Sequence, residues 1–357
     1  MKEPSYKEAL EAFANPFQEF SVEQVTNGLI NQSYKITDRN TRNSFLLQQI
    51  NEHVFEEPEK IQQNYESLWK YINAKKTSLR IPEPKFFINK RTWFVDQNKR
   101  YWRIFEFLEN TKTLTVAENI KEAGAVAETF ANFTACFNDF NIEKLQTTIP
   151  DFHNVSLRFE KFKQALKTAS AERLGKSKVL FEKLLQRERY AKLYQVFTIS
   201  GEFRKRIIHH DAKISNVLFD IRSGKVVCPV DFDTVMPGYF FSDLGDMIRT
   251  MSCTEDEAST NFDKILIRKE FYDAIVSAYS GVLKSQLTAS ENKYIHTAGL
   301  LMIYMQALRF LTDYLQNDRY YQVSYKEHNH DRALNQTVLL EKLEVFLSEH
   351  YNFIAEI

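Results

Sequence analysis

The fold of this chain is decided by the stretch His209-His-Asp-Ala-Lys-Ile-Ser-Asn216 together with the stretch Val226-Val-Cys-Pro-Val-Asp-Phe-Asp233. A hydrophobic run precedes the first stretch, and two more hydrophobic runs flank the polar turn Arg222-Ser-Gly-Lys225. Short hydrophobic runs separated by such a turn are typical of a β-hairpin. The order therefore predicts a strand, a polar loop and a hairpin, and the hairpin brings Asn216 close to Asp231.

Oxygen-bearing side chains in this arrangement are the groups that phosphoryl transfer needs. Asp211 would face the attacking hydroxyl group, and Asn216 and Asp231 would give Mg²⁺ the hard oxygen ligands it prefers on the phosphates of ATP. The ammonium of Lys213 would offset charge in the transition state. We therefore predict Asp211 and Lys213 as catalytic residues and Asn216 and Asp231 as metal ligands. Asp233 either binds a second metal ion or caps a turn.

The composition describes a globular chain without a strong charge bias. Its 357 residues suffice for about two domains of about 150 residues each, and 43% of them are hydrophobic, which is enough for a large core. Lys and Arg together number 47, as do Asp and Glu. Nucleic acid is therefore not expected as a partner, because its binding usually needs a concentrated basic surface. The glycine patterns of P-loop and Rossmann nucleotide sites are absent from the sequence.

Targeting and cysteine patterns predict a cytoplasmic protein. The first residues carry charged side chains and lack the apolar segment of a signal peptide. The longest apolar run, 297–308, is shorter than the roughly 20 residues that a membrane span needs. Three cysteines in hydrophobic contexts indicate reduced thiols. We expect no membrane partner, and either a monomer or a weak homodimer.

Hydrophobic periodicity divides the chain into a strand-rich first part and a helical remainder. Apolar runs and polar turns alternate through the first hundred residues, around one amphipathic helix at 58–74. Helical spacing dominates from Thr115-Val-Ala-Glu118, which has the form of a capping box, as does Thr288-Ala-Ser-Glu291. We predict a nucleotide-binding lobe over 1–108, and a lobe over 109–357 that carries the catalytic loop and the acceptor site.

The chain resembles the aminoglycoside phosphotransferase and choline kinase superfamily, and within it the N-acetylhexosamine 1-kinases look most similar. The segments that carry this resemblance are Gly28-Leu-Ile-Asn31, Phe45-Leu-Leu-Gln48-Gln-Ile-Asn51, Trp102-Arg103, Ile149-Pro-Asp-Phe-His153, Val230-Asp-Phe-Asp-Thr-Val-Met-Pro-Gly238, Asp243-Leu-Gly-Asp-Met-Ile-Arg249 and Arg309-Phe-Leu-Thr-Asp-Tyr-Leu315. The resemblance implies an α+β, protein-kinase-like bilobal fold with a small β-rich lobe and a larger, mainly helical lobe. It also implies transfer of phosphate from ATP to the anomeric hydroxyl group of a sugar.

The resemblance also assigns nucleotide contacts. They fall to Asn27, Gly28, Gln48, Glu106 and Leu108, with the adenine held at the segment around 106–108. A glycine among small polar residues, as in the turn at 26–33, can close over phosphates through its backbone N–H groups. Gln48 stands where kinases usually carry a lysine, and in this departure the chain resembles the hexosamine kinases.

The sugar would lie against four residues. By resemblance these are Asn31, Asp211, Arg309 and Tyr320. The residues themselves leave Arg309 with two interpretations, because an arginine in an apolar helix either pairs with an internal acid such as Asp313 or faces a cleft.

Three functions remain open at this stage. The first is a sugar 1-kinase, and the second keeps the fold but phosphorylates choline, homoserine, an aminoglycoside or another small alcohol. The third is a pseudokinase scaffold, which Gln48 and the missing glycine after Phe232 favour. In the C-terminal region the acids Asp313, Asp318 and Asp331 are matched by the basic residues Arg309, Arg319 and Arg332. This balance favours a neutral sugar over a polycationic aminoglycoside.

Overall fold

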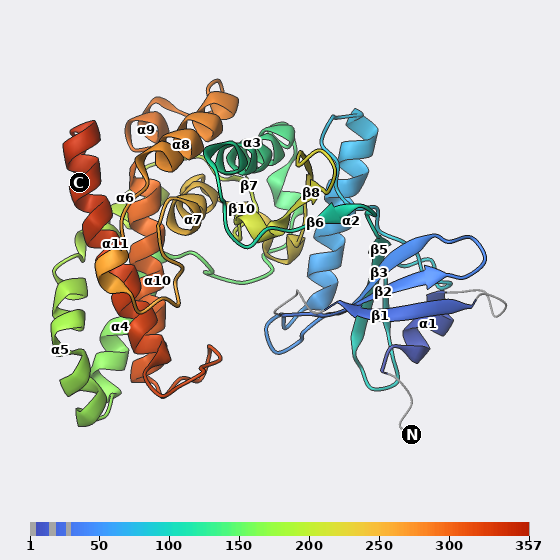
Figure 1. The fold of residues 1–357 in the computed structure, drawn as a ribbon, viewed down its shortest axis with the longest axis horizontal. Helices are drawn as coiled ribbons and strands as arrows, with labels where there is room; N and C mark the ends of the chain where they lie inside the picture. Colours follow the sequence, from blue (N-terminus) through green and yellow to red (C-terminus); the bar gives the residue numbers. More distant parts are fainter. Residues whose placement is uncertain (1–4, 14–18, 26–29, 357) are drawn as a thin grey trace. The chain divides into compact units, whose positions relative to one another are not determined.

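The computed structural model describes residues 5–13, 19–25 and 30–356 of the chain (Figure 1). Its architecture is mixed α+β, with a small antiparallel sheet in the N-terminal region and a larger helical region after it. The chain forms two compact units. The first comprises 1–113, 139–150 and 216–237, and the second comprises 114–138, 151–215 and 238–357. The lobe boundary expected between 108 and 109 stays a prediction.

The first unit is built on a five-stranded antiparallel sheet (Figure 1). Its strands, in spatial order, are β1 (Phe20–Val25), β2 (Gln32–Asp38), β3 (Ser44–Gln49), β5 (Tyr101–Glu106) and β4 (Trp93–Val95). Helix α1 (Lys7–Phe13) packs its buried Ala9 into a core with Leu47 and Trp102 of the sheet. The alternation of side chains along β2 puts Tyr34 and Ile36 into the same core.

Helix α2 (Pro58–Lys75) confirms the amphipathic helix expected at 58–74. Proline occupies its first turn, where the missing N–H would have no partner within the helix. Its buried face includes Ile61, Tyr65 and Leu68, at helical spacing. The helix ends at Lys75, and the C-cap residue Lys76 adopts the left-handed conformation with φ 50°.

The hairpin predicted from the opening stretch is confirmed. Strands β8 (Val217–Asp220) and β9 (Val226–Pro229) pair antiparallel, and β6 (Thr111–Lys112) extends them to a three-stranded sheet. The Asp220 carboxylate accepts hydrogen bonds from the backbone N–H and the hydroxyl of Ser223, and Gly224 has φ +66°, so the polar turn closes on itself. The short helix η3 (Phe232–Thr234) and strand β10 (Met236–Gly238) follow the hairpin.

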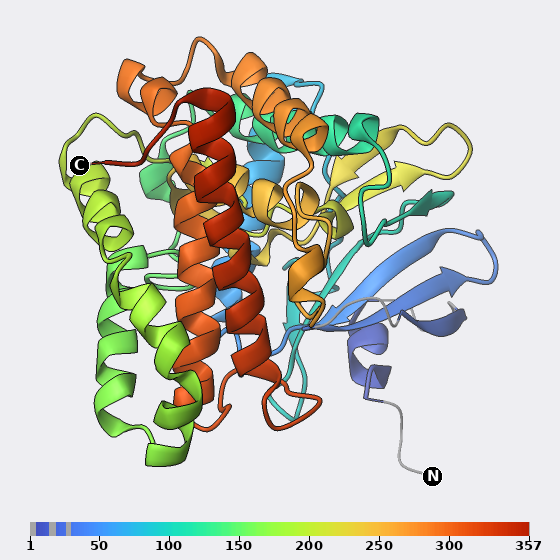
Figure 2. The same ribbon diagram turned by 60° about the vertical axis from the view of Figure 1, so that its left-hand side comes forward.

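The second unit is helical around a buried central helix, α10 (Thr297–Leu315). Helices α4 (Val155–Thr168), α7 (Phe241–Met251) and α11 (His328–Tyr351) pack against it, and Figure 2 shows α10 and α11 side by side in orange and red. The remaining elements are α3 (Ile120–Cys136), η1 (Ile142–Lys144, in the first unit), α5 (Ala171–Leu185), α6 (Arg189–Ile199), β7 (Arg206–Ile208), η2 (Ile214–Asn216), η4 (Phe262–Lys264), α8 (Lys269–Leu283) and α9 (Ala289–Lys293).

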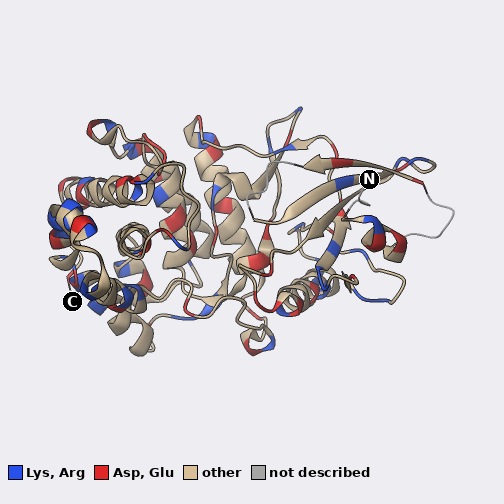
Figure 3. Ribbon diagram, turned by 90° about the horizontal axis from the view of Figure 1, so that it is seen from below, with Lys and Arg blue, Asp and Glu red and all other residues tan. Residues whose placement is uncertain are grey.

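Positions of both charge signs, coloured on the ribbon in Figure 3, are found on the helices of this unit. Glu344 on α11 pairs with Arg187 at 2.9 Å and with Arg189 at 2.8 Å, which joins the α5–α6 segment to α11. Across the part of the chain that the structure describes, no helix is both long enough and apolar enough to cross a membrane.

The two expected capping boxes have different outcomes. At α9 the Thr288 hydroxyl accepts from the backbone N–H of Glu291 and the Glu291 carboxylate accepts from that of Thr288, so this box is confirmed. The box at Thr115 is wrong, because α3 begins at Ile120 and its cap is Asn119, whose side chain accepts from the N–H of Glu122. Asparagine caps a helix as well as threonine does, and here it sits where the helix begins.

Candidate active site

The loop that carries Asp211, predicted to be catalytic, is anchored by a buried carboxylate on α7. Asp243 accepts hydrogen bonds from the backbone N–H of His209 at 2.9 Å and of His210 at 2.7 Å. Burial raises the pKa of Asp243 to about 7, although the two N–H groups act in the opposite direction. His210 has φ 63°, a left-handed conformation that is uncommon for residues other than glycine. These contacts fix the backbone at the two residues that precede Asp211.

Asp211 and Lys213 form an ion pair within this loop. Nζ of Lys213 lies 2.9 Å from Oδ2 of Asp211, and both side chains keep about a third of their surface exposed. A second bond, from the N–H of Lys213 to the carbonyl of Asp211 at 3.0 Å, tightens the loop. The structure therefore brings the two residues predicted as catalytic into direct contact, and their catalytic roles stay predictions.

Two arginines and two acids form a chain of ion pairs next to this loop. Arg249 contacts Asp246 at 3.0 Å and Glu257 at 2.6 Å, and Arg332 also pairs with Glu257. Burial raises the pKa of Asp246, which Arg249 lowers and the nearby Asp211 raises further. The two arginines hold the pKa of Glu257 at about 2 against the effect of burial. Asp246 and Glu257 are thus each paired with at least one guanidinium group.

The structure brings Arg309 and Tyr320 together, two residues predicted to bind substrate. The Arg309 guanidinium lies 5.7 Å from the centroid of the Tyr320 ring, and 5.5 Å and 5.3 Å from those of Tyr321 and Phe152. Its hydrogen-bond partner is the Oε1 atom of Gln306 at 3.3 Å. The alternative pairing with Asp313 is not formed. That Arg309 binds the substrate stays a prediction.

Asp313 instead holds the loop that carries Tyr320. Its carboxylate accepts hydrogen bonds from three successive backbone N–H groups, those of Arg319, Tyr320 and Tyr321, at 2.8–2.9 Å. The side-chain amide of Asn329 adds a fourth at 3.0 Å. Four donors on one buried carboxylate fix the backbone from which the tyrosines project.

The predicted metal ligands both lie in the first unit. The carbonyl of Asn216 accepts a hydrogen bond from the N–H of Val230 at 2.9 Å, which places Asn216 beside the residue that precedes Asp231. Asp231 is exposed and has φ 64°, whereas Asn216 is buried. An amide oxygen and a carboxylate suit Mg²⁺, which often takes one or two protein ligands and completes its shell with phosphate and water. The donor set fits the ion, and the assignment stays a prediction.

Asp233 is the centre of a buried network in the first unit. Arg103 donates to it from Nη1 at 2.5 Å and Nη2 at 3.0 Å, and Asn31 donates from Nδ2 at 2.7 Å. The Nε atom of Arg103 donates to Oε1 of Gln48 at 3.0 Å, and Gln48 donates to the Ser33 hydroxyl at 2.9 Å. Gln48 thus orients the arginine that holds Asp233. The roles of Asn31 and Gln48 in binding sugar and nucleotide stay predictions.

Sequence reasoning missed the partnership of Arg103 with Asp233. Arg103 stands among the hydrophobic residues of β5 and is 3% exposed. A charged residue in a buried strand needs an ionic partner, which was the available signal. The sequence does not identify that partner, because 130 positions separate the two residues.

Of the remaining residues predicted to contact the nucleotide, the structure describes Glu106 and Leu108. The Glu106 carboxylate accepts from the N–H of Glu83 at 3.1 Å, and the carbonyl of the buried Leu108 accepts from the Thr111 hydroxyl at 2.6 Å. Asn27 and Gly28 lie outside the described residues. Contacts with the nucleotide at all four positions stay predictions.

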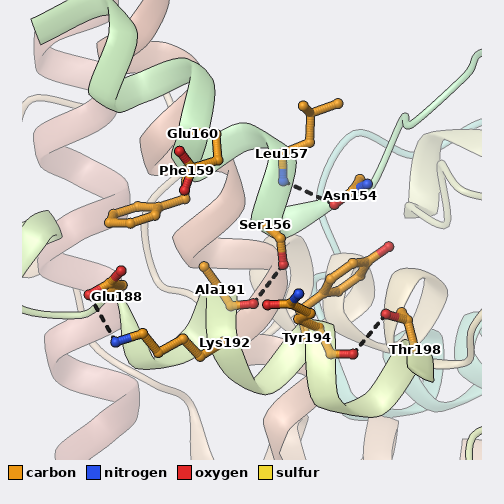
Figure 4. A pocket seen from close by; sticks show the side chains of 11 residues that line it. Asn154, Ser156, Leu157, Phe159, Glu160, Glu188, Ala191, Lys192, Tyr194 and Thr198 are labelled. Carbon is orange, nitrogen blue, oxygen red and sulfur yellow. Dashed lines mark hydrogen bonds and ion pairs between the residues drawn. The ribbon is translucent and has the colours of Figure 1, made fainter. Parts of the chain in front are cut away.

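A cleft of about 440 Å³ lies between α4 and α6 (Figure 4). Some of its polar groups bond to each other, since the Ser156 hydroxyl donates to the carbonyl of Ala191 at 2.6 Å and Lys192 pairs with Glu188 at 3.1 Å. None of the predicted site residues lines it. We therefore do not assign the acceptor to this cleft.

Comparison with known proteins identifies the family. The model of the phosphotransferase enzyme family, APH, matches residues 21–281, which is more than half of the chain. The chain belongs to the phosphotransferase enzyme family. Its enzymatic class is therefore phosphoryl transfer. The matched range includes the loop of Asp211 and the hairpin that follows it.

Solved structures confirm the expected protein-kinase-like fold class. An aminoglycoside phosphotransferase from Alicyclobacillus acidocaldarius is similar at TM-score 0.65 and 13% identity, over 99% of this chain and 97% of that one. Choline kinase from Cryptosporidium parvum is similar at TM-score 0.52 and 14% identity, over 98% and 94%. The GDP complex of aminoglycoside 2′-phosphotransferase-IIIa is similar at TM-score 0.57 and 10% identity, over 94% and 99%.

Proposed function

We propose that this phosphotransferase moves the γ-phosphoryl group of ATP, in the presence of Mg²⁺, to the anomeric 1-hydroxyl of an N-acetylhexosamine or a related sugar. The product is a sugar 1-phosphate. The observation that carries the proposal is the anchoring of the catalytic loop, in which Asp243 holds the backbone of His209 and His210 just before Asp211. A fixed backbone at this point holds the carboxylate in place for the incoming hydroxyl group.

Asp211 accepts the proton of the sugar hydroxyl in this mechanism. The ammonium of Lys213 lies 2.9 Å from this carboxylate. The anomeric hydroxyl is more acidic than an ordinary alcohol, so a weak base suffices. Lys213 then stays beside the reacting oxygens and offsets the charge that develops on the transferred group.

Asn216 and Asp231 would hold Mg²⁺ on the phosphates of ATP. The ion supplies charge neutralisation at the phosphate oxygens. The protein's own contribution is to keep the two ligands next to each other, through the bond between the Asn216 carbonyl and the N–H of Val230. A nucleotide as the phosphate donor is supported by the related phosphotransferase that was solved with GDP.

A cationic acceptor such as choline or an aminoglycoside is less well supported. Such an acceptor needs carboxylates in its site, and the C-terminal acids are already occupied. Asp313 is bound by backbone N–H groups, Asp318 pairs with Arg173 at 2.7 Å, and Asp331 accepts from the Tyr325 hydroxyl at 2.9 Å. The side chains around Tyr320 offer a guanidinium and aromatic rings instead.

The scaffold alternative rests chiefly on Gln48, and the network around Asp233 weakens it. Gln48 has a structural task here, because it accepts from the Arg103 that binds Asp233. The positive group that kinases usually place on this strand is then supplied, in our proposal, by Lys213. We also propose a cytosolic enzyme, which is supported by the absence of disulfides among Cys136, Cys228 and Cys253, all three within the described residues.

The test is ADP release from ATP with N-acetylglucosamine, N-acetylgalactosamine, glucose, galactose, mannose and choline. Wild type is compared with Asp211→Asn and with Asp263→Asn, an exposed aspartate in the same unit that serves as control. We expect turnover with one or more sugars that is lost in Asp211→Asn and kept in the control. Turnover with choline alone would favour the second function, and binding of ATP with no turnover for any acceptor would favour a scaffold.

A further inference from the structure

Arg158 and Arg309, both in the second unit, contact no carboxylate among the residues that the structure describes. Arg158 on α4 donates to the carbonyls of Asp151 at 3.3 Å and Phe152 at 3.0 Å, and its Nε atom is buried without a hydrogen-bond partner. Arg309 on α10 donates to Gln306 and otherwise faces aromatic rings. Guanidinium groups that are partly buried normally pair with an acid, since desolvation penalises an isolated charge.

The two arginines are neighbours across Phe152. Arg158 donates to the backbone carbonyl of this residue, and the Arg309 guanidinium lies 5.3 Å from its ring centroid. Burial lowers the pKa of Arg158, and the charge of Arg309 lowers it further. Two like charges thus act on each other in a partly desolvated region, an arrangement that an anion between them would stabilise.

The acids that pair with neighbouring arginines do not contact Arg158 or Arg309. Asp246 pairs with Arg249, and Glu257 pairs with Arg249 and Arg332. Asp151, an acid that acts on Arg158, is exposed and accepts from Asn154 at 2.9 Å.

Uncharged polar side chains lie beside Arg158 and Arg309. The Tyr321 hydroxyl is buried without a hydrogen-bond partner, and burial raises its pKa although Arg309 acts in the opposite direction. It therefore stays a phenol that can donate. His153 stacks on Phe152 with ring centroids 4.5 Å apart, and burial followed by the charges of its neighbours lowers its pKa, so it adds no further charge.

We propose that Arg158, Arg309 and the Tyr321 hydroxyl form an anion subsite of the acceptor region, and that the sugar acceptor carries a negatively charged substituent, a carboxylate or a phosphate ester. The inference rests on the proposed function, because it takes the acceptor to be a sugar. Paired guanidiniums bind such groups through parallel N–H···O bonds. This anionic acceptor departs from the neutral sugar that counting charges in the sequence favours, because neither Arg158 nor Arg309 contacts a carboxylate among the described residues.

The experiment compares sugars that differ only at carbon 6. Values of kcat/KM are measured for glucose, glucuronate and glucose 6-phosphate, and for galactose and galacturonate, with wild type, Arg158→Gln, Arg309→Gln and Tyr321→Phe. Arg319→Gln, at an exposed position on the same loop, is the control. We expect the anionic sugars to exceed their neutral partners in wild type. Each arginine variant should lower kcat/KM for the anionic sugars alone by about ten- to a hundredfold, chiefly through KM.

Two outcomes would overturn the subsite while the proposed function stands. The first is turnover of neutral sugars with no gain from a carboxylate or a phosphate. The second is an equal loss of kcat for neutral and anionic sugars in Arg309→Gln, which would mean that the arginine acts on the transferred phosphoryl group. Uronate turnover without glucose 6-phosphate turnover identifies the carboxylate as the substituent, and the converse identifies the phosphate ester.

A binding measurement decides the subsite if no sugar is phosphorylated, a result that would remove the proposed function. Calorimetric titration of the full chain with glucuronate, glucose 6-phosphate and glucose then reports on the arginines alone. Binding of either anion that Arg158→Gln and Arg309→Gln both weaken, with circular dichroism spectra unchanged, supports the subsite. Absence of binding in wild type, or equal binding by the variants, refutes it.

Discussion

Arg103 and Asp233 form a two-point ion pair inside the first unit, with N–H···O distances of 2.5 Å and 3.0 Å, although 130 positions separate them in the sequence. Both side chains are 3% exposed. The pair links β5 to the segment that follows the hairpin, and Asn31 and Gln48 complete its hydrogen bonds. A fully bonded pair of this kind keeps one local arrangement, because any shift would leave a buried charge without its partner.

Arg103→Lys is therefore expected to destabilise the protein. An ammonium cannot reproduce both bonds to Asp233 and the bond to Gln48, so the free energy of unfolding should fall by about 3 kcal/mol. Urea unfolding measures this change. The matched control is Arg39→Lys, whose pair with Glu19 is exposed and 3.6 Å long, and it should stay within about 0.5 kcal/mol of wild type. Equal midpoints for wild type and Arg103→Lys would refute this account of the pair.

Asp243→Asn should lower kcat by about a hundredfold, because the amide turns an N–H group toward one of the two backbone N–H groups and displaces the loop before Asp211. The same variant tests the raised pKa. A carboxyl group whose pKa is higher in the folded state than in the unfolded state contributes stability at low pH and loses it as the pH rises.

The free energy of unfolding of wild type, measured relative to that of Asp243→Asn, should thus fall between about pH 4 and the folded-state pKa of about 7. Chemical unfolding at several pH values in this window gives the difference directly. A difference that stays constant with pH would show that Asp243 titrates normally in the folded protein.

Asp313→Asn should weaken binding of the acceptor more than it changes turnover. The carboxylate holds three backbone N–H groups in the loop of Tyr320, and an amide can accept from them only partly. We expect KM for the acceptor to rise about tenfold, with KM for ATP nearly unchanged. Steady-state kinetics with each substrate varied in turn measures both values. A larger effect on ATP than on the acceptor would contradict a role at the acceptor.

Lys213→Met should reduce kcat by about a hundredfold and leave KM for the acceptor close to wild type, because the ammonium is proposed to act on charge that develops in the transition state. Lys178→Met is the control, since Lys178 is an exposed residue of α5. Single-turnover kinetics separates the chemical step from product release. Unchanged turnover in Lys213→Met would remove this role for the lysine.

Local sequence patterns predicted the helices and strands that depend on neighbouring residues in the sequence. The hairpin at 217–229 follows from its polar turn, and α2 follows from the spacing of its apolar residues. The capping boxes mark the limit of such patterns. Thr115 and Thr288 have the same four-residue signature, but only Thr288 caps a helix, because Asn119 provides a competing cap a few positions later.

Long-range partnerships could not be predicted in the same way. Asp313 lies four residues from Arg309, one helical turn away. Its carboxylate nevertheless accepts hydrogen bonds from the backbone of the loop at 319–321 and does not pair with Arg309. Which partner the Asp313 carboxylate binds depends on the path of the loop after α10. The periodicity of hydrophobic residues does not predict that path. The sequence also does not reveal that Arg158 and Arg309 lack a carboxylate partner, because Asp246 and Glu257 pair with other arginines only in the folded chain.

The central claim is transfer of phosphate to the anomeric hydroxyl group of a sugar, and phosphorus NMR of the product tests it most directly. The sugars tested above are incubated with ATP and Mg²⁺, and the new phosphate signal is examined for coupling to the proton on carbon 1. The account predicts a sugar 1-phosphate that wild type forms and Asp211→Asn does not. A phosphate on any other hydroxyl, or the same product from Asp211→Asn, would contradict it.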